Sequence, residues 1–234
     1  MNKQSEEKIL NIVKKNYDDI AEQYNETRKK HLEPLWNHLV EYAKEAPKRA
    51  KILDIGCGNG RLIEAFNDMP IDYLGIDPCE ELINKAKEQK YGFRFELGNI
   101  LELDKFEETN FDYIFSTAVI HHLPGQALRI KALKQMKNKL NENGKIILTV
   151  WNLWSQKRFQ RLLLKFNLKK LIFQNKMDFN DILFPWKNPQ GKIVSERYYH
   201  AFTKKKLKKI SQKADLKIEK LFKDKFNYYL VLTK

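Results

Sequence analysis

The segment LDIGCGNGR, residues 53–61, constrains the fold more than any other part of this 234-residue chain. Its glycines stand at alternate positions directly after an apolar stretch. Glycine has no Cβ, so the backbone can turn sharply there and approach a ligand closely. The next apolar stretch ends in Asp77, about twenty residues further on, where a carboxylate can accept hydrogen bonds from the two hydroxyls of a ribose. The pattern predicts a nucleoside-binding site in a turn between a strand and a helix.

The spacing of the glycines separates two kinds of nucleoside ligand. Gly56, Gly58 and Gly60 form G-x-G-x-G, whereas a dinucleotide fold shows G-x-G-x-x-G with a helix N-terminus aimed at the pyrophosphate. Asp54 adds a negative charge that opposes a phosphate but suits a ligand carrying a sulfonium or ammonium cation. The turn therefore favours S-adenosylmethionine over NAD.

Strands and helices alternate through most of the sequence. The expected strands are 51–55, 72–77, 93–97, 111–116, 145–150, 215–222 and 227–233. The expected helices are 61–67, 80–89, 124–140 and 203–214, after two N-terminal helices between Glu6 and about Ala43. Parallel strands need right-handed crossover helices between them, so this order predicts an α/β fold with a doubly wound, mostly parallel seven-stranded sheet.

The regular alternation of strands and helices ends after Trp151. A basic amphipathic stretch and the segment LFPWK follow there in place of a plain crossover helix. We therefore expect one domain, residues 1–234, with a basic insertion before the last two strands. Its parts are an N-terminal helical cap, a cofactor-binding core, an inserted substrate-binding lobe, and a C-terminal helix with strands, at 1–45, 46–151, 152–200 and 201–234.

The charge of the chain is uneven. Residues 151–234 hold 21 Lys and Arg against 6 Asp and Glu, a net +15, whereas residues 1–150 have a net charge of −1. Such asymmetry is typical of a surface that meets a polyanion such as nucleic acid, although a lysine-rich, solvated surface has the same composition. The chain has no apolar run long enough to span a bilayer and no signal peptide, so a cytoplasmic protein is expected. Cys57 and Cys79 suggest neither a disulfide nor a metal site.

Several methyl-transfer chemistries are excluded by the residues that follow the fourth strand. The chain reads STAVIHH at 116–122. It lacks the N/D-P-P-aromatic turn of enzymes that methylate amino groups of nucleobases. It also lacks the Pro-Cys nucleophile of enzymes that methylate carbon 5 of pyrimidines. This favours an acceptor that is already a good nucleophile, such as a carboxylate or an easily deprotonated hydroxyl. One member of the pair His121 and His122 is expected to face this acceptor, because consecutive residues cannot both point inward. Arg129 is a candidate clamp for an anionic acceptor.

The glycine turn with Asp77 resembles the Rossmann-like class I methyltransferases, and motifs in the rest of the chain resemble one group among them. These motifs are Y-D-x-I-A-x-x-Y-x-x-T-R at 17–28, A-V-I-H-H-x6-R at 118–129, V-W-N at 150–152, P-W-K at 185–187 and R-Y-Y-H-x-F at 197–202. The group is the family of tRNA wobble-uridine methyltransferases that esterify 5-carboxymethyluridine, related to the methyltransferase portion of AlkB-type tRNA hydroxylases. The resemblance extends from Tyr17 to Tyr229.

The resemblance implies a role for each matching residue. S-adenosylmethionine, which leaves as S-adenosylhomocysteine, would be held by Tyr17, Tyr24, Arg28, Asp54, Gly56, Gly58, Asp77, Pro78, Asn99, Ile100 and Ala118. The acceptor side would be lined by His121 or His122, Arg129, Trp151, Asn152, Arg197 and His200. The implied partners are the anticodon stem-loop of tRNA and, as in eukaryotic relatives, a small zinc-binding activator protein.

Two other functions fit the same residues less well. One is an O-methyltransferase for a small carboxylate or phenolic metabolite, favoured by the absence of a recognised RNA-binding module. The other is a binding protein that retains S-adenosylmethionine for structure, disfavoured because the set around Asp54, Asp77 and the two histidines is intact.

Overall fold

The computed structural model describes residues 1–27, 34–66, 69–88, 92–172, 174–188 and 190–234. The α-helices are α1 (Lys3–Thr27), α2 (Leu35–Glu45), α3 (Glu80–Glu88), α4 (Gln126–Lys139), α5 (Lys157–Leu171) and α6 (Lys204–Lys213). Short 3-10 helices are η1 (Arg61–Phe66), η2 (Leu103–Lys105), η3 (Ile120–His122) and η4 (Leu153–Ser155). The strands are β1 (Lys51–Ile55), β2 (Asp72–Asp77), β3 (Arg94–Leu97), β4 (Phe111–Thr117), β5 (Leu140–Trp151), β6 (Asp181–Lys187), β7 (Ile193–His200), β8 (Lys217–Lys223) and β9 (Asn227–Thr233).

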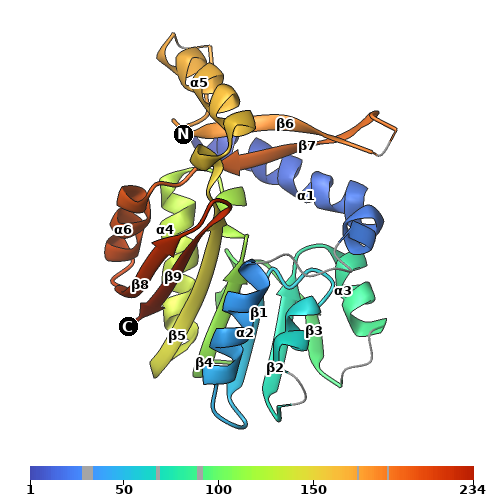
Figure 1. The fold of residues 1–234 in the computed structure, drawn as a ribbon, viewed down its shortest axis with the longest axis vertical. Coiled ribbons are helices and arrows are strands. Elements are labelled where there is room, and N and C mark those ends of the chain that lie inside the picture. The colour runs from blue at the N-terminus through green and yellow to red at the C-terminus, as the bar shows by residue number, and fades with distance from the viewer. Residues whose placement is uncertain (28–33, 67–68, 89–91, 173, 189) are drawn as a thin grey trace.

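Seven of these strands form one sheet in the order β3-β2-β1-β4-β5-β9-β8 (Figure 1). β1 to β5 pair in parallel, and β9 is antiparallel to both of its neighbours. Strand order reverses between β1 and β4, where the chain crosses from one half of the sheet to the other. The prediction of a doubly wound, mostly parallel seven-stranded sheet is confirmed.

Helices cover both faces of the sheet, which is why its inner strands are apolar almost throughout. One core cluster joins the sheet to α4 and α6, and the other joins it to α2, α3 and η1. The clusters leave the carboxyl ends of the strands uncovered by sheet-packing helices. Those ends, at the edge nearest α1 in Figure 1, are where a ligand can approach.

The helix expected at 61–67 is the clearest local difference from the sequence prediction. The described part of this segment is the 3-10 helix η1, Arg61–Phe66, and residue 67 lies outside the described residues. The helix expected at 124–140 starts later, at Gln126, because Gly125 precedes it with φ 70°. The last strand begins and ends where it was expected.

The insertion holds a second, two-stranded sheet that the sequence pattern did not predict. β6 and β7 form an antiparallel hairpin, in which Pro185 pairs with Glu196. Proline donates no hydrogen bond, so it is tolerated only where a strand has a free edge, and both strands of a two-stranded sheet have one. α5 packs on β6 through Phe159, Leu163 and Phe184.

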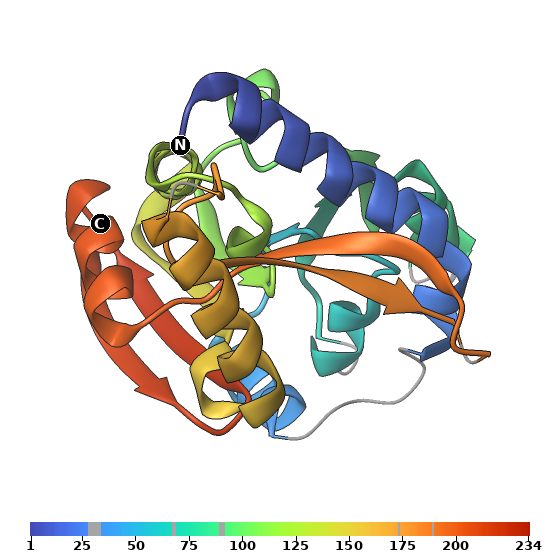
Figure 2. The same ribbon diagram turned by 90° about the horizontal axis from the view of Figure 1, so that it is seen from above.

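The hairpin lies across the carboxyl edge of the main sheet beside α1, as both ribbon views show (Figures 1 and 2). Polar contacts join the two elements: the Trp186 indole nitrogen donates to Gln23 at 2.5 Å and the Ser195 hydroxyl to Asp19 at 3.0 Å. α1 and the hairpin thus form a roof over the ends of the strands. Within the described ranges no helix is both long and apolar enough to cross a bilayer.

Candidate active site

A cavity of about 330 Å³ lies between the roof and the carboxyl ends of β1, β2 and β4. Its volume falls in the range that proteins use for small-molecule ligands. Nine of the eleven residues predicted to hold the cofactor line it: Tyr17, Tyr24, Gly56, Gly58, Asp77, Pro78, Asn99, Ile100 and Ala118. Arg28 lies outside the described residues, and Asp54 is not in the cavity wall.

The glycine turn needs glycine for two different reasons. Gly56, Gly58 and Gly60 all have positive φ, at 73°, 57° and 75°, a region that favours glycine. A Cβ on Gly56 would also collide with the side chain of Val119, and one on Gly60 would come within 2.7 Å of Phe95. The first two glycines line the cavity, whereas the third allows the turn to pack against the core.

Asp77 presents a fixed carboxylate to the cavity. One of its oxygens accepts the backbone N–H of Gly58 at 3.0 Å and the other accepts that of Cys79 at 2.9 Å. Burial raises the pKa of this carboxyl to about 6, and the two backbone hydrogen bonds oppose the shift. Each carboxylate oxygen can accept more than one hydrogen bond, so both oxygens can still receive the hydroxyls of a ribose. The residues present therefore fit the nucleoside part of S-adenosylmethionine.

Asp54 supports the turn from behind. It is 2% exposed and accepts a hydrogen bond from the hydroxyl of Tyr73 at 2.7 Å. Burial raises its pKa to about 7. The sequence led us to expect that this carboxylate faces the cation of the ligand. In the structure it faces the hydroxyl of Tyr73.

The two histidines differ in how their ring nitrogens are used. His122 lies within hydrogen-bond distance of the Tyr17 hydroxyl at Nε2, 2.9 Å, and of the Tyr198 carbonyl at Nδ1, 3.2 Å. A carbonyl can only accept, so Nδ1 carries the proton and Nε2 accepts from Tyr17. Burial lowers the pKa of His122 to about 4, which keeps the ring neutral.

His121 has one nitrogen without a partner among the described residues. Its Nδ1 accepts the backbone N–H of Trp151 at 3.4 Å, so Nε2 carries the proton of the neutral ring. That Nε2 is buried and has no partner there. Burial lowers the pKa of His121 well below its usual value. Both histidines line the cavity, but only His121 has an N–H left to offer to an acceptor.

Arg197 brings a cation to the same cavity. Its guanidinium carbon lies 3.2 Å from the centre of the Trp186 ring, and its Nε has no hydrogen-bond partner in the part of the chain that the structure describes. No carboxylate within the described ranges pairs with it. Burial lowers the pKa of Arg197, and a hydrogen bond with Tyr199 opposes the shift. A delocalised cation held over an indole ring is suited to binding a planar anion.

Aromatic rings line the same cavity as His121 and Arg197. Tyr199 stacks on Trp151 with ring centres 4.8 Å apart and on Phe184 with centres 5.3 Å apart. Trp151, Trp186 and Tyr199 line the cavity and offer a planar base an aromatic wall to pack against.

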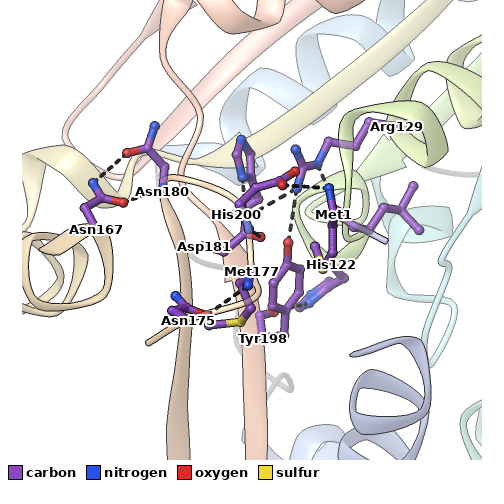
Figure 3. A network of polar contacts seen from close by, with 12 residues as sticks. Met1, His122, Arg129, Asn167, Asn175, Met177, Asn180, Asp181, Tyr198 and His200 are labelled. Carbon is purple, nitrogen blue, oxygen red and sulfur yellow. Dashed lines mark hydrogen bonds and ion pairs between the residues drawn. The ribbon is translucent and has the colours of Figure 1, made fainter. Parts of the chain in front are cut away.

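Arg129 and His200, by contrast, lie in a buried polar network (Figure 3). Arg129 donates to the Leu123 carbonyl at 2.9 Å and to the Tyr198 hydroxyl at 3.1 Å, and its terminal nitrogen lies 3.4 Å from Asp181. His200 donates from Nδ1 to the same Asp181 oxygen at 2.6 Å. Arg129, Asp181 and His200 are each 0% exposed, and none of them lines the cavity. The anion that Arg129 needs is supplied by the protein itself.

Asn152 also lies outside the cavity wall. Its backbone N–H donates to the carbonyl of Phe226 at 2.7 Å and its side-chain amide to the carbonyl of Asp224 at 2.8 Å. These bonds fix the end of β5 to the turn between β8 and β9. Asn152 is therefore placed as a support for Trp151, which does line the cavity.

Sequence reasoning did not single out Asp181. The residue lies 52 positions from Arg129, so no local pattern links the two. One signal was available: residues 152–200 contain only three acids, Asp178, Asp181 and Glu196, among ten Lys and Arg. A rare acid in a basic apolar segment indicates a buried ion pair, because an unpaired buried charge is costly.

Solved structures share the fold of this chain. An S-adenosylmethionine-dependent methyltransferase from Methanosarcina mazei superposes with a TM-score of 0.68 at 19% identity, over 88% of this chain and 99% of that one. A protein from Pyrococcus horikoshii superposes with a TM-score of 0.63 at 24% identity, over 93% and 94% of the two chains. These similarities show the fold of the S-adenosylmethionine-dependent methyltransferases.

The sequence comparisons are more specific. A family model described as a methyltransferase domain matches residues 24–221, and the chain belongs to this methyltransferase family. A protein of Encephalitozoon cuniculi that is described as a methyltransferase is 33% identical over 154 residues, 64% of this chain and 68% of the relative. The tRNA (carboxymethyluridine(34)-5-O)-methyltransferases of Saccharomyces cerevisiae and Schizosaccharomyces pombe are 29% and 25% identical. The match covers 64% of this chain and 51% of the first, and 93% of this chain and 94% of the second.

Proposed function

We propose that this protein transfers a methyl group from S-adenosylmethionine to the carboxylate of 5-carboxymethyluridine at the wobble position of tRNA, forming the methyl ester. The name shared by the two fungal relatives supports this substrate, since one of them matches along 94% of its length. The observation that carries the proposal is the pairing, in one cavity, of a carboxylate-binding side with a nucleoside-binding side. His121 and Arg197 each have an N–H without a partner among the described residues, and both line the cavity that Asp77 also lines.

The acceptor needs no general base. Carboxyl groups have ordinary pKa values near 4, so the carboxylate is ionised and nucleophilic at neutral pH. When bound, S-adenosylmethionine supplies a methyl group that leaves its sulfonium as the new oxygen–carbon bond forms. No proton is transferred in this step, and positioning of the carboxylate is the main task of the protein.

His121 and Arg197 are the groups we assign to that positioning. The Nε2–H of His121 donates to one carboxylate oxygen, and the guanidinium of Arg197 restrains the carboxylate by charge and hydrogen bonding. Because His121 is neutral, it does not protonate the acceptor, and the carboxylate keeps the negative charge that makes it nucleophilic. Trp151 and Tyr199 form an aromatic wall of the cavity against which the uracil ring packs. Because the roof covers these groups, water is kept from the reacting oxygen.

His122 has a different role in this proposal. It joins Tyr17 on α1 to the Tyr198 carbonyl on β7, so it ties the two parts of the roof together. Tyr17 and Tyr24 also line the cavity, where their rings can face the sulfonium cation. We therefore assign His121 to the acceptor and His122 to closure over the cofactor.

The partners in the proposal are the anticodon stem-loop of tRNA and a small zinc-binding activator protein. The second rests on the family resemblance and on a Haloferax volcanii complex between a methyltransferase activator and its methyltransferase. That methyltransferase is 14% identical to this chain with a TM-score of 0.64, a likeness in fold. Activity that rises when the activator from the same organism is added would support this part of the proposal.

The function is tested with labelled S-adenosylmethionine and two matched tRNAs. One tRNA carries 5-carboxymethyluridine at the wobble position, and the other carries unmodified uridine there. We expect label only on the first tRNA, released as methanol by mild alkali because a methyl ester is hydrolysed under conditions that leave base methylation intact. Equal labelling of both tRNAs, or label on a free small carboxylic acid but on neither tRNA, would contradict the proposal and favour a metabolite O-methyltransferase.

A further inference from the structure

Two exposed helices of this chain have the same charge but different positions. α5 and α6 each contain six Lys or Arg and no acidic residue. The basic residues of α5 are Lys157, Arg158, Arg161, Lys165, Lys169 and Lys170. Those of α6 are Lys204, Lys205, Lys206, Lys208, Lys209 and Lys213. Five side chains of each set are exposed, and none of either set is paired with a carboxylate of the described residues. Composition therefore cannot say which helix meets a polyanion.

Position distinguishes the two helices. α5 packs on β6, whose partner strand β7 carries Arg197 and Tyr199 into the cavity. It lies on the side of the molecule where the hairpin and α1 cover the strand ends (Figures 1 and 2). α6 packs against α4 and β8 through Leu207 and Ile210, on one face of the main sheet. No residue of either helix lines the cavity, so the two helices differ in what they pack on: α5 on the hairpin that supplies part of the cavity wall, α6 on the main sheet.

We propose that α5, and not α6, is the surface along which the backbone of the tRNA stem lies while the wobble base occupies the cavity. This inference rests on the proposed function and adds the route by which the substrate is held. Arg158, Arg161, Lys165 and Lys169 follow one another at steps of three and four residues, so they form a row along one side of the helix. A 15-residue helix is about 22 Å long, enough for such a row to meet several phosphates.

The outer side of α5 also carries exposed leucines. Leu164, Leu168 and Leu171 are 62%, 60% and 62% exposed. A protein partner with an apolar groove would use these leucines, whereas phosphates would use the cations that stand between them. The absence of any acid on the helix favours the phosphates, and the leucines give an internal control on the same element.

Two double variants with the same spacing test the inference. Arg161→Ala with Lys165→Ala removes two cations from α5, and Lys205→Ala with Lys209→Ala removes two from α6. Dissociation constants for tRNA carrying 5-carboxymethyluridine are measured without turnover between 50 and 200 mM salt, and KM and kcat are measured separately. Each lost phosphate contact lowers the slope of log K against log salt by about 0.9 in a duplex region. We expect the α5 variant to lose about one to two in slope and to raise KM about tenfold or more, with kcat unchanged at saturation.

The α6 variant should match the parent protein in slope and KM. An equal loss in both variants would show a diffuse basic surface and overturn the inference, as would an α5 variant that binds like the parent. A third variant, Leu164→Ser with Leu168→Ser, should bind tRNA normally; weakened activity in this variant alone would identify α5 as a protein-docking helix instead. If the parent protein fails to methylate this tRNA the proposed function is wrong, while the binding arm of the experiment still reports on α5.

Discussion

The two arginines expected on the acceptor side, Arg129 and Arg197, show opposite uses of the same residue type. Arg129 is fully buried and is paired with Asp181, the Tyr198 hydroxyl and the Leu123 carbonyl through two of its three guanidinium nitrogens. Arg197 lies over the Trp186 ring in the cavity wall with no carboxylate partner among the described residues. The difference is decided by where the nearest anion is. A cation whose anion is already part of the protein stabilises the fold, and one whose anion is missing is available to a ligand.

The largest effect on stability should come from removing Arg129, the arginine that is paired within the protein. Arg129→Met leaves the Asp181 carboxylate buried without its cation, and breaking a buried pair in this way costs about 3–5 kcal/mol in the free energy of unfolding. Urea denaturation followed by circular dichroism measures the change. The double variant Arg129→Met with Asp181→Asn removes both charges, keeps an acceptor for His200, and should recover much of the loss. A single variant as stable as the parent protein would contradict a structural role for this pair.

Arg197→Met should have the opposite effect to Arg129→Met, with a large loss of activity and a small loss of stability. Loss of a group that orients the carboxylate for in-line attack lowers kcat/KM by about 10²-fold. The stacking on Trp186 is worth only about 0.5–1 kcal/mol in the free energy of unfolding. Arg197→Lys keeps the charge without the planar fork and should recover part of the activity. Full activity in Arg197→Met would remove this residue from the acceptor site.

The adjacent histidines extend the comparison on a smaller scale. His121→Phe keeps a flat ring but removes the N–H that orients the carboxylate, so kcat should fall by about 10²-fold with cofactor affinity unchanged. His122→Phe breaks the bonds to Tyr17 and the Tyr198 carbonyl, each worth about 1 kcal/mol, and should chiefly weaken cofactor binding. Steady-state kinetics together with calorimetric titration of S-adenosylhomocysteine separate the two outcomes. If the two variants exchange these phenotypes, our assignment of the histidines is reversed.

The fold could be predicted from sequence because its determinants are local. Strands buried on both faces give continuous apolar runs, and the run ending at Asp77 placed both the strand and its carboxylate correctly. The hairpin could not be predicted, since β6 contains Pro185 and its pairing with β7 depends on residues beyond the strand itself. The partner of Arg129 was hidden for the same reason, because ion pairs across 52 residues leave no periodic signal.

The smallest effect we expect is a pH dependence on the cofactor side of the cavity. Burial raises the pKa of Asp77 to about 6 in the folded protein, so the carboxyl gains a proton as the pH falls through that value. An ionised carboxylate accepts ribose hydroxyls better than a protonated one, so affinity for S-adenosylhomocysteine should rise with pH from 5 and level off above about 7. One pH unit below the pKa the affinity should be about tenfold weaker. Asp77→Asn should bind weakly and without this dependence between pH 5 and 6. Asp54, whose pKa is about 7, remains in that variant. Any pH dependence of the affinity that persists there can therefore be assigned to Asp54. An unchanged pH profile in Asp77→Asn would assign the titration to Asp54, and with it the charge that the cofactor senses.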